Sequence, residues 1–364
     1  MLAPTHRTAS RPVALWLFAL CAMILVMVSL GGATRLTGSG LSIMEWAPIM
    51  GTLPPLSEAE WQRLFTLYRA IPQYSLVHAG FGLDGFKEIF WLEWAHRLWG
   101  RLMGLAFLLP LIWFASRRQL SRTLYLRLAG LLILGGMQGA VGWFMVASGF
   151  EADSTAVSPY RLVLHLTLAL TLFAAIAWTA LDCWSANTPR PKSPAWLQPA
   201  ATTLVGLVAL TIIAGGFVAG LKAGLTYNTF PLMDGHLIPT GYTTLQPVLR
   251  NLTENVAAVQ FDHRLLATLT ALVALTVAGF GLSARPNPTT RAILLSVAAL
   301  VATQYALGVA TLLAHVPVLL GTLHQATAVL LLGAALALRH ATRHRTPALR
   351  PSQALPFAAS LDPT

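Results

Sequence analysis

Four histidines recur in pairs in the two halves of the chain. His96 stands in the string Glu93-Trp-Ala-His-Arg-Leu98, and His263 stands in Gln260-Phe-Asp-His-Arg-Leu265, 167 positions later. His165 is followed 159 positions later by His324, each preceded by a leucine. Neutral imidazole is a common ligand of iron, copper and zinc. The repeat therefore predicts two sites that each contain two imidazoles.

Other short strings repeat in the same order. Gln138-x-x-x-Gly142 matches Gln304-x-x-x-Gly308, 166 positions later, and Gly31-Gly32 matches Gly215-Gly216. Similar spacings in the same order indicate an internal duplication. We expect an N-terminal unit over residues 1–185, which includes a long outer loop, and a C-terminal unit over residues 186–364, which ends in a cytoplasmic tail.

The elements that hold these histidines are predicted to be membrane-spanning helices. Hydrophobic residues make up 55% of the 364 positions and charged residues only 10%, a balance unlike that of soluble domains. A helix needs about 20 apolar residues to cross a bilayer. Stretches free of charge cover 12–34, 128–150, 162–181, 193–221 and 265–284; a shorter one covers 102–116, and one of 47 residues, 292–338, divides at Pro317.

The predicted fold is an all-α integral membrane protein of eight transmembrane helices. Because each unit has an even number of crossings, the two four-helix bundles should be related by a pseudo-twofold axis along the membrane normal. Positively charged short loops stay in the cytoplasm, which places both termini there and favours a bacterial inner membrane. The predicted inner segments hold 14 of the 24 Lys and Arg residues: Arg7, Arg11, Arg117, Arg118, Arg122, Arg127, Arg190, Lys192, Arg285, Arg291, Arg339, Arg343, Arg345 and Arg350.

The net charge of +11 is therefore mainly a topology signal. A nucleic-acid partner would need a basic soluble face, and the sequence predicts none. The partner that the composition does predict is the lipid bilayer.

This topology gives the four histidines a common depth. Helices two, four, six and eight all run inward from the outer face, and each histidine is expected within about two turns of its start. The two imidazoles of one unit can then face each other across a planar metal complex. Four residues further on, on the same helical face, stand small residues that would let a porphyrin approach: Gly100, Ala169, Ala267 and Ala328.

Heme ligation is the interpretation we favour for these pairs. A copper or zinc site is the alternative, although such sites usually recruit Cys, Met or carboxylate ligands as well. Small residues also pack transmembrane helices without any cofactor.

The two copies differ at the position three residues before the first histidine, where Glu93 in one copy corresponds to Gln260 in the other. Residues i and i+3 share a helical face, so we expect Glu93 to point towards the cavity of His96 as an acid or base. Pairing with Arg97 or Arg101 is the structural alternative.

The first outer loop, 35–92, contains a capping box, Ser57-x-x-Glu60. Trp61, Leu64, Phe65 and Tyr68 follow at helical spacing. This pattern predicts an amphipathic helix that lies on the membrane surface, either as an interface anchor or as a substrate lid.

Over residues 11–338 the chain resembles heme A synthase of the proteobacterial and mitochondrial branch. The resemblance rests on five strings: Gly31-Gly-Ala-Thr-Arg-Leu-Thr-Gly-Ser-Gly-Leu41, Phe86-Lys-Glu-Ile-Phe90, Glu93-Trp-Ala-His-Arg97, Tyr227-Asn-Thr-Phe-Pro-Leu-Met-Asp234 and Gln260-Phe-Asp-His-Arg264.

The resemblance implies an oxidoreductase that oxidises the C8 methyl of heme O to the formyl group of heme A, with water as the oxygen source, for heme-copper oxidase assembly. It implies that His96 and His165 ligate one heme, that His263 and His324 ligate another, and that Glu93 is catalytic. Heme O would then occupy the N-terminal unit and a permanent heme b the C-terminal unit.

The resemblance also suggests protein partners and propionate-binding residues. Arg97, Arg101 and Arg264 would pair with heme propionates. Heme O synthase and cytochrome oxidase assembly factors are the implied partners, beside heme O and heme A, and the electron acceptor stays open.

Two other classes of protein compete with this interpretation. A di-heme b-type electron-transfer membrane protein would need the same ligands but no asymmetric carboxylate. A transporter, heme exporter or chaperone is the third class. The paired histidines, and the lack of a predicted charged residue at mid-bilayer along a path, count against transport.

Overall fold

The computed structural model describes residues 10–152, 154–186 and 193–343, and within these ranges every extended regular element is a helix. Eight of the helices in the described residues are long and apolar enough to cross a membrane. The prediction of an all-α protein with eight membrane-spanning helices is therefore confirmed. They are α1 (Ser10–Leu36), α4 (Leu83–Ser116), α5 (Arg122–Ala147), α6 (Pro159–Trp184), α7 (Leu197–Gly220), α9 (Val256–Ser283), α10 (Pro288–Leu313) and α11 (Val318–Ala341).

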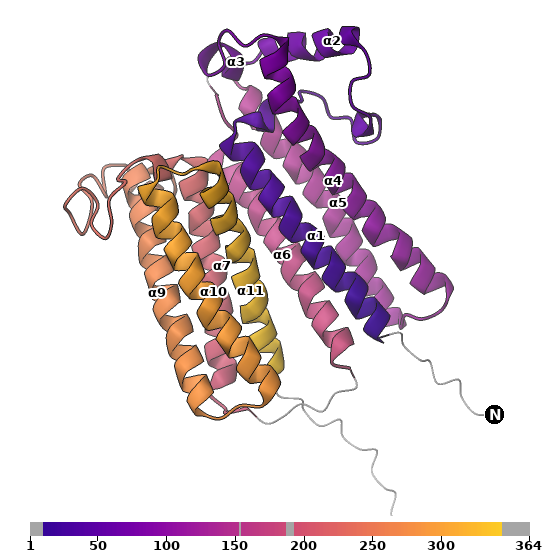
Figure 1. Ribbon diagram of the computed structural model, residues 1–364, viewed down its shortest axis with the longest axis vertical. Coiled ribbons are helices and arrows are strands. Elements are labelled where there is room, and N and C mark those ends of the chain that lie inside the picture. Colours follow the sequence, from indigo (N-terminus) through magenta and orange to yellow (C-terminus); the bar gives the residue numbers. More distant parts are fainter. Residues whose placement is uncertain (1–9, 153, 187–192, 344–364) are drawn as a thin grey trace, which may run out of the picture.

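The long helices form two groups of four (Figure 1). Helix α1 packs on α4, α4 on α5, α5 on α6 and α6 on α1, and the same cyclic order joins α7, α9, α10 and α11. The groups meet where α1 packs on α11, α6 on α7, and α6 on α11. If α1, α4, α5 and α6 are exchanged with α7, α9, α10 and α11, each of these contacts has an equivalent in the set. The arrangement is therefore compatible with the predicted pseudo-twofold relation.

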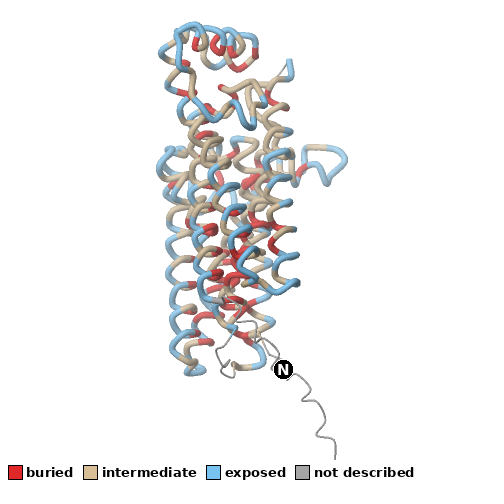
Figure 2. Tube along the Cα trace, turned by 90° about the vertical axis from the view of Figure 1, so that its right-hand side faces the viewer, coloured by how far each residue is buried: buried red, intermediate tan, exposed pale blue. Residues whose placement is uncertain are grey.

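One apolar core runs through both groups of helices. Leu17 of α1, Ile176 of α6, Leu204 of α7 and Val329 of α11 are almost completely buried and belong to it. In Figure 2 the buried positions follow the inner faces of the helices, whereas pale blue covers their outer faces. Large apolar side chains such as Leu109 are exposed on those outer faces, as expected of helices that face lipid.

Pro317 separates α10 from α11, as the sequence predicted, and it caps the start of α11. The start of α4 was predicted wrongly. The helix begins at Leu83, so His96 lies 13 residues into it rather than within the first two turns. Asp84, Lys87 and Glu88 interrupt the apolar pattern there and concealed three helical turns.

A small outer domain packs on this extension of α4. It contains α2 (Glu58–Arg69) and α3 (Pro72–Leu76), and the Ser57 hydroxyl accepts a hydrogen bond from the Glu60 backbone N–H at the start of α2, which confirms the capping box. The predicted position of α2 on the bilayer is wrong, because its apolar face is buried against protein. The buried cluster consists of Leu41, Trp61, Leu64, Phe65, Tyr68, Ile71, Phe86, Ile89 and Phe90.

Short helices complete the loops. The short helices are η1 (Ser39–Leu41), η2 (Met50–Thr52), η3 (Ser148–Phe150), η4 (Ala223–Leu225), η5 (Val248–Arg250) and α8 (Asn251–Glu254).

Nine of the predicted inner-side cations lie at the end of the bundles where α1 begins (Figure 1). The other five, Arg7, Arg190, Lys192, Arg345 and Arg350, lie outside the described residues, as do both chain ends.

A polar cluster joins the two groups of helices at that same end. The Asp182 carboxylate of α6 accepts hydrogen bonds from Arg343 Nη2 and His340 Nε2, both at 3.0 Å, and from Arg127 Nη1 of α5 at 3.3 Å. The His340 ring stands edge-on to Trp178, with ring centroids 5.1 Å apart. One carboxylate thus connects α5 and α6 to the inner end of α11.

Replacing Asp182 with Asn should weaken the junction between the two bundles. The variant keeps the side-chain size but leaves Arg127 and Arg343 without a counter-charge, at a cost of roughly 1–3 kcal/mol. We expect a lower thermal unfolding midpoint of the detergent-solubilised protein. Glu88→Gln, which changes an exposed carboxylate of α4, is the control, and equal midpoints for both variants would contradict the role of Asp182.

Candidate heme sites

Each repeated histidine faces a glycine of a neighbouring helix. A Cβ atom built on three of these glycines would lie 2.9 Å from the imidazole Cε1 atom, which is closer than real Cβ atoms come. On Gly31 it would lie 3.1 Å from His96 Nε2. The missing side chains therefore make room for the rings. The pairs are Gly31 of α1 with His96, Gly142 of α5 with His165, Gly215 of α7 with His263, and Gly308 of α10 with His324.

The histidines of one unit come from helices that lie diagonally across the bundle. His96 is on α4 and His165 is on α6, which are not neighbours in the cyclic order, and the two imidazoles are close enough to interact electrostatically. His263 on α9 and His324 on α11 repeat this relation. The structure thus brings together the two pairs that the sequence predicted. Two imidazoles that approach from opposite helices suit axial ligation of a planar metal complex.

The second glycine of each Gly-Gly pair faces the other unit. Gly32 of α1 packs against the side chain of Gln325 on α11, and Gly216 of α7 packs against Leu166 on α6. Gln325 and Leu166 each follow a repeated histidine directly. One glycine of each pair therefore makes room for a ring, and the next lets the two units approach closely.

Hydrogen bonds orient the rings. His263 Nδ1 lies 3.1 Å from the Thr211 carbonyl oxygen, so it carries the proton and leaves Nε2 free to bind a metal. The Gln138 amide nitrogen lies 3.2 Å from His165 Nδ1 and donates to the His165 carbonyl oxygen at 3.0 Å. Gln304 reaches His324 Nε2 at 3.5 Å. The sequence marked both glutamines as repeated but gave them no role.

The donor set fits heme better than a cluster metal site. Among the residues that the structure describes, no group of three or more His, Cys, Asp or Glu side chains is arranged to hold a metal ion. Axial ligation of heme needs only two imidazoles. His324 Nδ1, Gln138 Oε1 and Gln304 Oε1 are buried polar atoms without a hydrogen-bond partner in the described residues, so polar groups beside both pairs are available to a bound molecule.

Glu93 forms the structural pairing that the sequence left open. The residue is buried, with 2% of its surface exposed. Oε1 accepts hydrogen bonds from Arg97 Nε at 3.0 Å and from Arg97 Nη2 at 2.5 Å. Oε2 accepts from the Ser42 hydroxyl at 2.7 Å and the Ile43 N–H at 2.8 Å. Both oxygens are surrounded by donors, which suits the carboxylate form, and no hydrogen bond or ion pair with Arg101 is found.

Gln260 occupies the equivalent place with the opposite hydrogen-bond polarity. Its amide nitrogen donates to the carbonyl oxygens of Ala223 at 2.8 Å and Thr226 at 2.6 Å, and its Oε1 accepts from Arg264 Nη2 at 3.1 Å. Both side chains hold an outer loop on a helix. Glu93 therefore suits a loop that offers hydrogen-bond donors, and Gln260 suits a loop that offers carbonyl acceptors.

The loops themselves are repeated, which the sequence analysis missed. Arg97 donates to the carbonyl oxygens of Ile43 and Glu45, at 2.6 and 2.9 Å, and Arg264 donates to those of Tyr227 and Thr229 at the same distances. Each acceptor lies 184 positions after its counterpart, the spacing of the Gly-Gly pairs. The strings Gly40-Leu41-Ser42 and Gly224-Leu225-Thr226 were the available signal.

Two of the three predicted propionate-binding arginines keep a free donor. Arg101 donates to the carbonyl oxygens of Pro48 and Ala47, both at 2.8 Å, and its buried Nη1 has no partner in the described residues. The buried Nε of Arg264 is likewise unpaired there. All three guanidinium nitrogens of Arg97 are already bonded, so Arg101 and Arg264 are the better candidates.

A cluster of side-chain ion pairs stabilises the first outer loop. Arg63 of α2 forms paired hydrogen bonds of 2.8 Å with the Glu45 carboxylate and also bonds Glu60. Hydrogen bonds from the Arg63 guanidinium hold the pKa of both carboxyl groups below the usual range. Because Arg97 binds the Glu45 carbonyl oxygen, this cluster connects the outer domain to the helix that carries His96.

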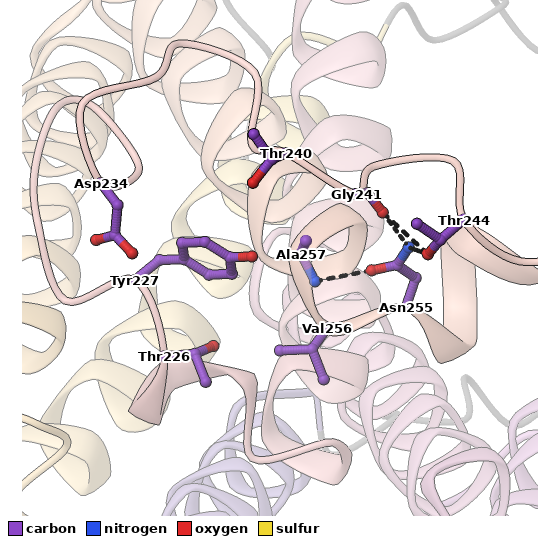
Figure 3. A pocket seen from close by; sticks show the side chains of 9 residues that line it. All are labelled: Thr226, Tyr227, Asp234, Thr240, Gly241, Thr244, Asn255, Val256 and Ala257. Atoms are coloured by element: carbon purple, nitrogen blue, oxygen red, sulfur yellow. Dashed lines mark hydrogen bonds between the residues drawn. The ribbon is translucent and has the colours of Figure 1, made fainter.

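A pocket of about 700 Å³ lies in the outer loop of the C-terminal unit, and Figure 3 shows Tyr227, Asp234 and Asn255 among its lining residues. It is an open pocket above the helices, and both polar and apolar atoms line it. Its floor includes Thr226, whose carbonyl oxygen binds Gln260, but none of the four repeated histidines lines it.

Comparison with known proteins agrees with the resemblance inferred from the sequence. A heme A synthase of Granulibacter bethesdensis is 60% identical over 91% of this chain and 87% of its own length. Heme A synthases of Azorhizobium caulinodans and Nitrosospira multiformis are 50% and 46% identical, each over 92% of this chain and 95% and 94% of their own lengths. The family described as cytochrome oxidase assembly protein matches residues 14–336, and the chain belongs to this COX15-CtaA family.

Proposed function

We propose that this protein oxidises heme O to heme A, as the names of its relatives indicate. The C8 methyl group and one water molecule yield a formyl group, four electrons and four protons. The electrons pass to an external electron acceptor. The observation that carries the proposal is the pair of unequal sites, each with two imidazoles, of which one has a buried carboxylate and the other an amide.

In this proposal the N-terminal unit, residues 1–185, binds heme O between His96 and His165. The C-terminal unit, residues 186–364, holds heme b between His263 and His324. Heme b with two imidazole ligands supplies one-electron transfer. Arg101 and Arg264, each with an N–H group that has no partner among the described residues, bind propionates from the outer side.

Glu93 is the proposed catalytic carboxylate, although it does not stand free in the cavity as the sequence suggested. Its four hydrogen bonds fix the carboxylate beside the His96 helix, and it can accept a proton only as its bond to Arg97 or Ser42 loosens. Buried carboxylates in polar networks often serve in this way. The same network attaches the first outer loop to α4, so Glu93 also positions that loop.

The proposed location is the bacterial inner membrane, with both termini in the cytoplasm. The cations gathered at the end where α1 begins support this orientation. Heme O synthase and cytochrome oxidase assembly factors are the proposed protein partners, since the former would supply the substrate and the latter would receive the product.

Heme extraction from the purified protein tests the function directly. Cells that supply heme O should yield protein containing heme b together with heme O and heme A. Two equivalents of heme b and no heme A would instead identify a di-heme electron-transfer protein.

Adding one methyl group at a ring-facing glycine should empty one site at a time. A Cβ at Gly142 or Gly308 would lie 2.9 Å from the neighbouring imidazole, so the ring must move. We expect Gly142→Ala to lose heme O and heme A while keeping heme b, and Gly308→Ala to lose heme b. Quantifying the extracted hemes per chain checks this, and the opposite pattern would reverse the assignment of the two units.

Replacing Glu93 with Gln should stop catalysis but keep heme bound. Proton transfer by a positioned side chain contributes about 10²–10⁴-fold to rate, so we expect the heme A yield to fall at least about 100-fold. Gln260→Glu is the matched control, because the reciprocal exchange disturbs the loop attachment of the other unit and should likewise keep heme bound. Unchanged heme A production by Glu93→Gln would remove Glu93 from the mechanism.

A further inference from the structure

The two units differ at the seam between their second and third spanning helices. In the C-terminal unit the Tyr305 hydroxyl of α10 and the Thr268 hydroxyl of α9 form a hydrogen bond of 3.0 Å across this seam. Phe230 of the outer loop packs edge-on against the Tyr305 ring, with centroids 6.2 Å apart. A ring, a hydrogen bond and a loop residue together close the seam.

The N-terminal unit has none of these three contacts at the equivalent level. Gly139 of α5 takes the place of Tyr305, at the spacing of 166 positions that relates Gln138 to Gln304. Arg101 takes the place of Thr268, and its guanidinium is directed to the loop carbonyl oxygens of Ala47 and Pro48. Gly139 is exposed, and a Cβ built on it would meet no described atom within 4 Å, so no side chain fills the space beside it.

The loop residue that corresponds to Phe230 packs elsewhere. Trp46, 184 positions earlier, contacts Trp143, with ring centroids 5.5 Å apart. Trp143 is one helical turn beyond Gly139 towards the outer end of α5. In the N-terminal unit the aromatic contact between the loop and the helix therefore lies one turn nearer the outer end of α5. The loop aromatic Trp46 does not pack beside Gly139.

Gly139 lies close to the histidine pair of its unit. Gly139 follows Gln138, whose amide contacts His165, and precedes by three residues Gly142, which faces the same ring. In the C-terminal unit Tyr305 stands in the same relation to Gln304 and Gly308. Gly139 and Tyr305 therefore occupy equivalent positions beside the two histidine pairs.

We infer that the α4–α5 seam at Gly139 admits the hydrocarbon chain of heme O, and that Tyr305 closes the α9–α10 seam so that the C-terminal unit accepts only a heme without such a chain. This inference rests on the proposed function. Heme O differs from heme b by a long farnesyl-derived chain at the porphyrin edge. Such a chain is too large for the interior of a closed four-helix bundle and is stable in lipid.

Heme-binding measurements on purified variants test the inference. In Gly139→Tyr, we expect at least a tenfold loss of heme O, measured by spectral titration with heme O, and an equal loss of heme A yield, while bound heme b is unchanged. Gly130→Tyr is the matched control. Gly130 lies nine residues earlier on α5, on the opposite helical face, and its Cβ would also meet no atom within 4 Å.

The reciprocal change opens the C-terminal unit. Tyr305→Gly should bind heme O at both sites, so the extracted ratio of heme O to heme b should rise at least tenfold, whereas Tyr305→Phe, which keeps the ring, should retain heme b alone there. Heme O binding by Gly139→Tyr at the wild-type level, or an unchanged heme ratio in Tyr305→Gly, would overturn the inference.

Two further results keep the test decisive. Should Gly139→Tyr lose heme b as well, Gly139→Val repeats the test with a smaller side chain, and undiminished heme O binding by it would overturn the inference. Failure of the proposed function has a different signature, because the wild-type protein would then bind heme O but form no heme A. Loss of that binding in Gly139→Tyr would still support the seam.

Discussion

The fit of an imidazole against a glycine is the constraint on which both sites depend. An imidazole directed into a four-helix bundle needs the space that a neighbouring side chain would otherwise fill, and in all four cases a glycine of an adjacent helix provides it. Gly31 and Gly215 are each followed by a second glycine, which lets the other unit approach. A two-residue string repeated in the sequence therefore sets both the ring positions and the junction between the units.

The outer loops are the second requirement for the sites. Arg97 and Arg264 hold equivalent backbone segments on equivalent helices, and Glu93 and Gln260 hold the same segments with opposite polarity. The unit with the carboxylate is also the one whose helix seam lacks the tyrosine. Duplication thus explains the common frame, and a few substitutions at equivalent positions make the two sites unequal.

Much of this arrangement could be predicted from the sequence, because membrane helices and repeated histidines leave strong signals. The start of α4 could not, since Phe86 and Phe90 pack on α2 and their burial is visible only with both helices in place. The partner of Glu93 depends on how residues 42–43 fold back over α4. The role of Tyr305 was hidden because a tyrosine and a glycine at equivalent positions look like ordinary divergence.

We propose that one chain holds two hemes in equivalent but unequal bis-histidine sites. A cryo-electron microscopy map of the heme-loaded protein tests it most directly, because iron and porphyrin density can be assigned to each unit. We expect one porphyrin between His96 and His165, with a hydrocarbon chain leaving between α4 and α5, and one without such a chain between His263 and His324. A single heme shared between the units, or iron bound by other residues, would contradict it.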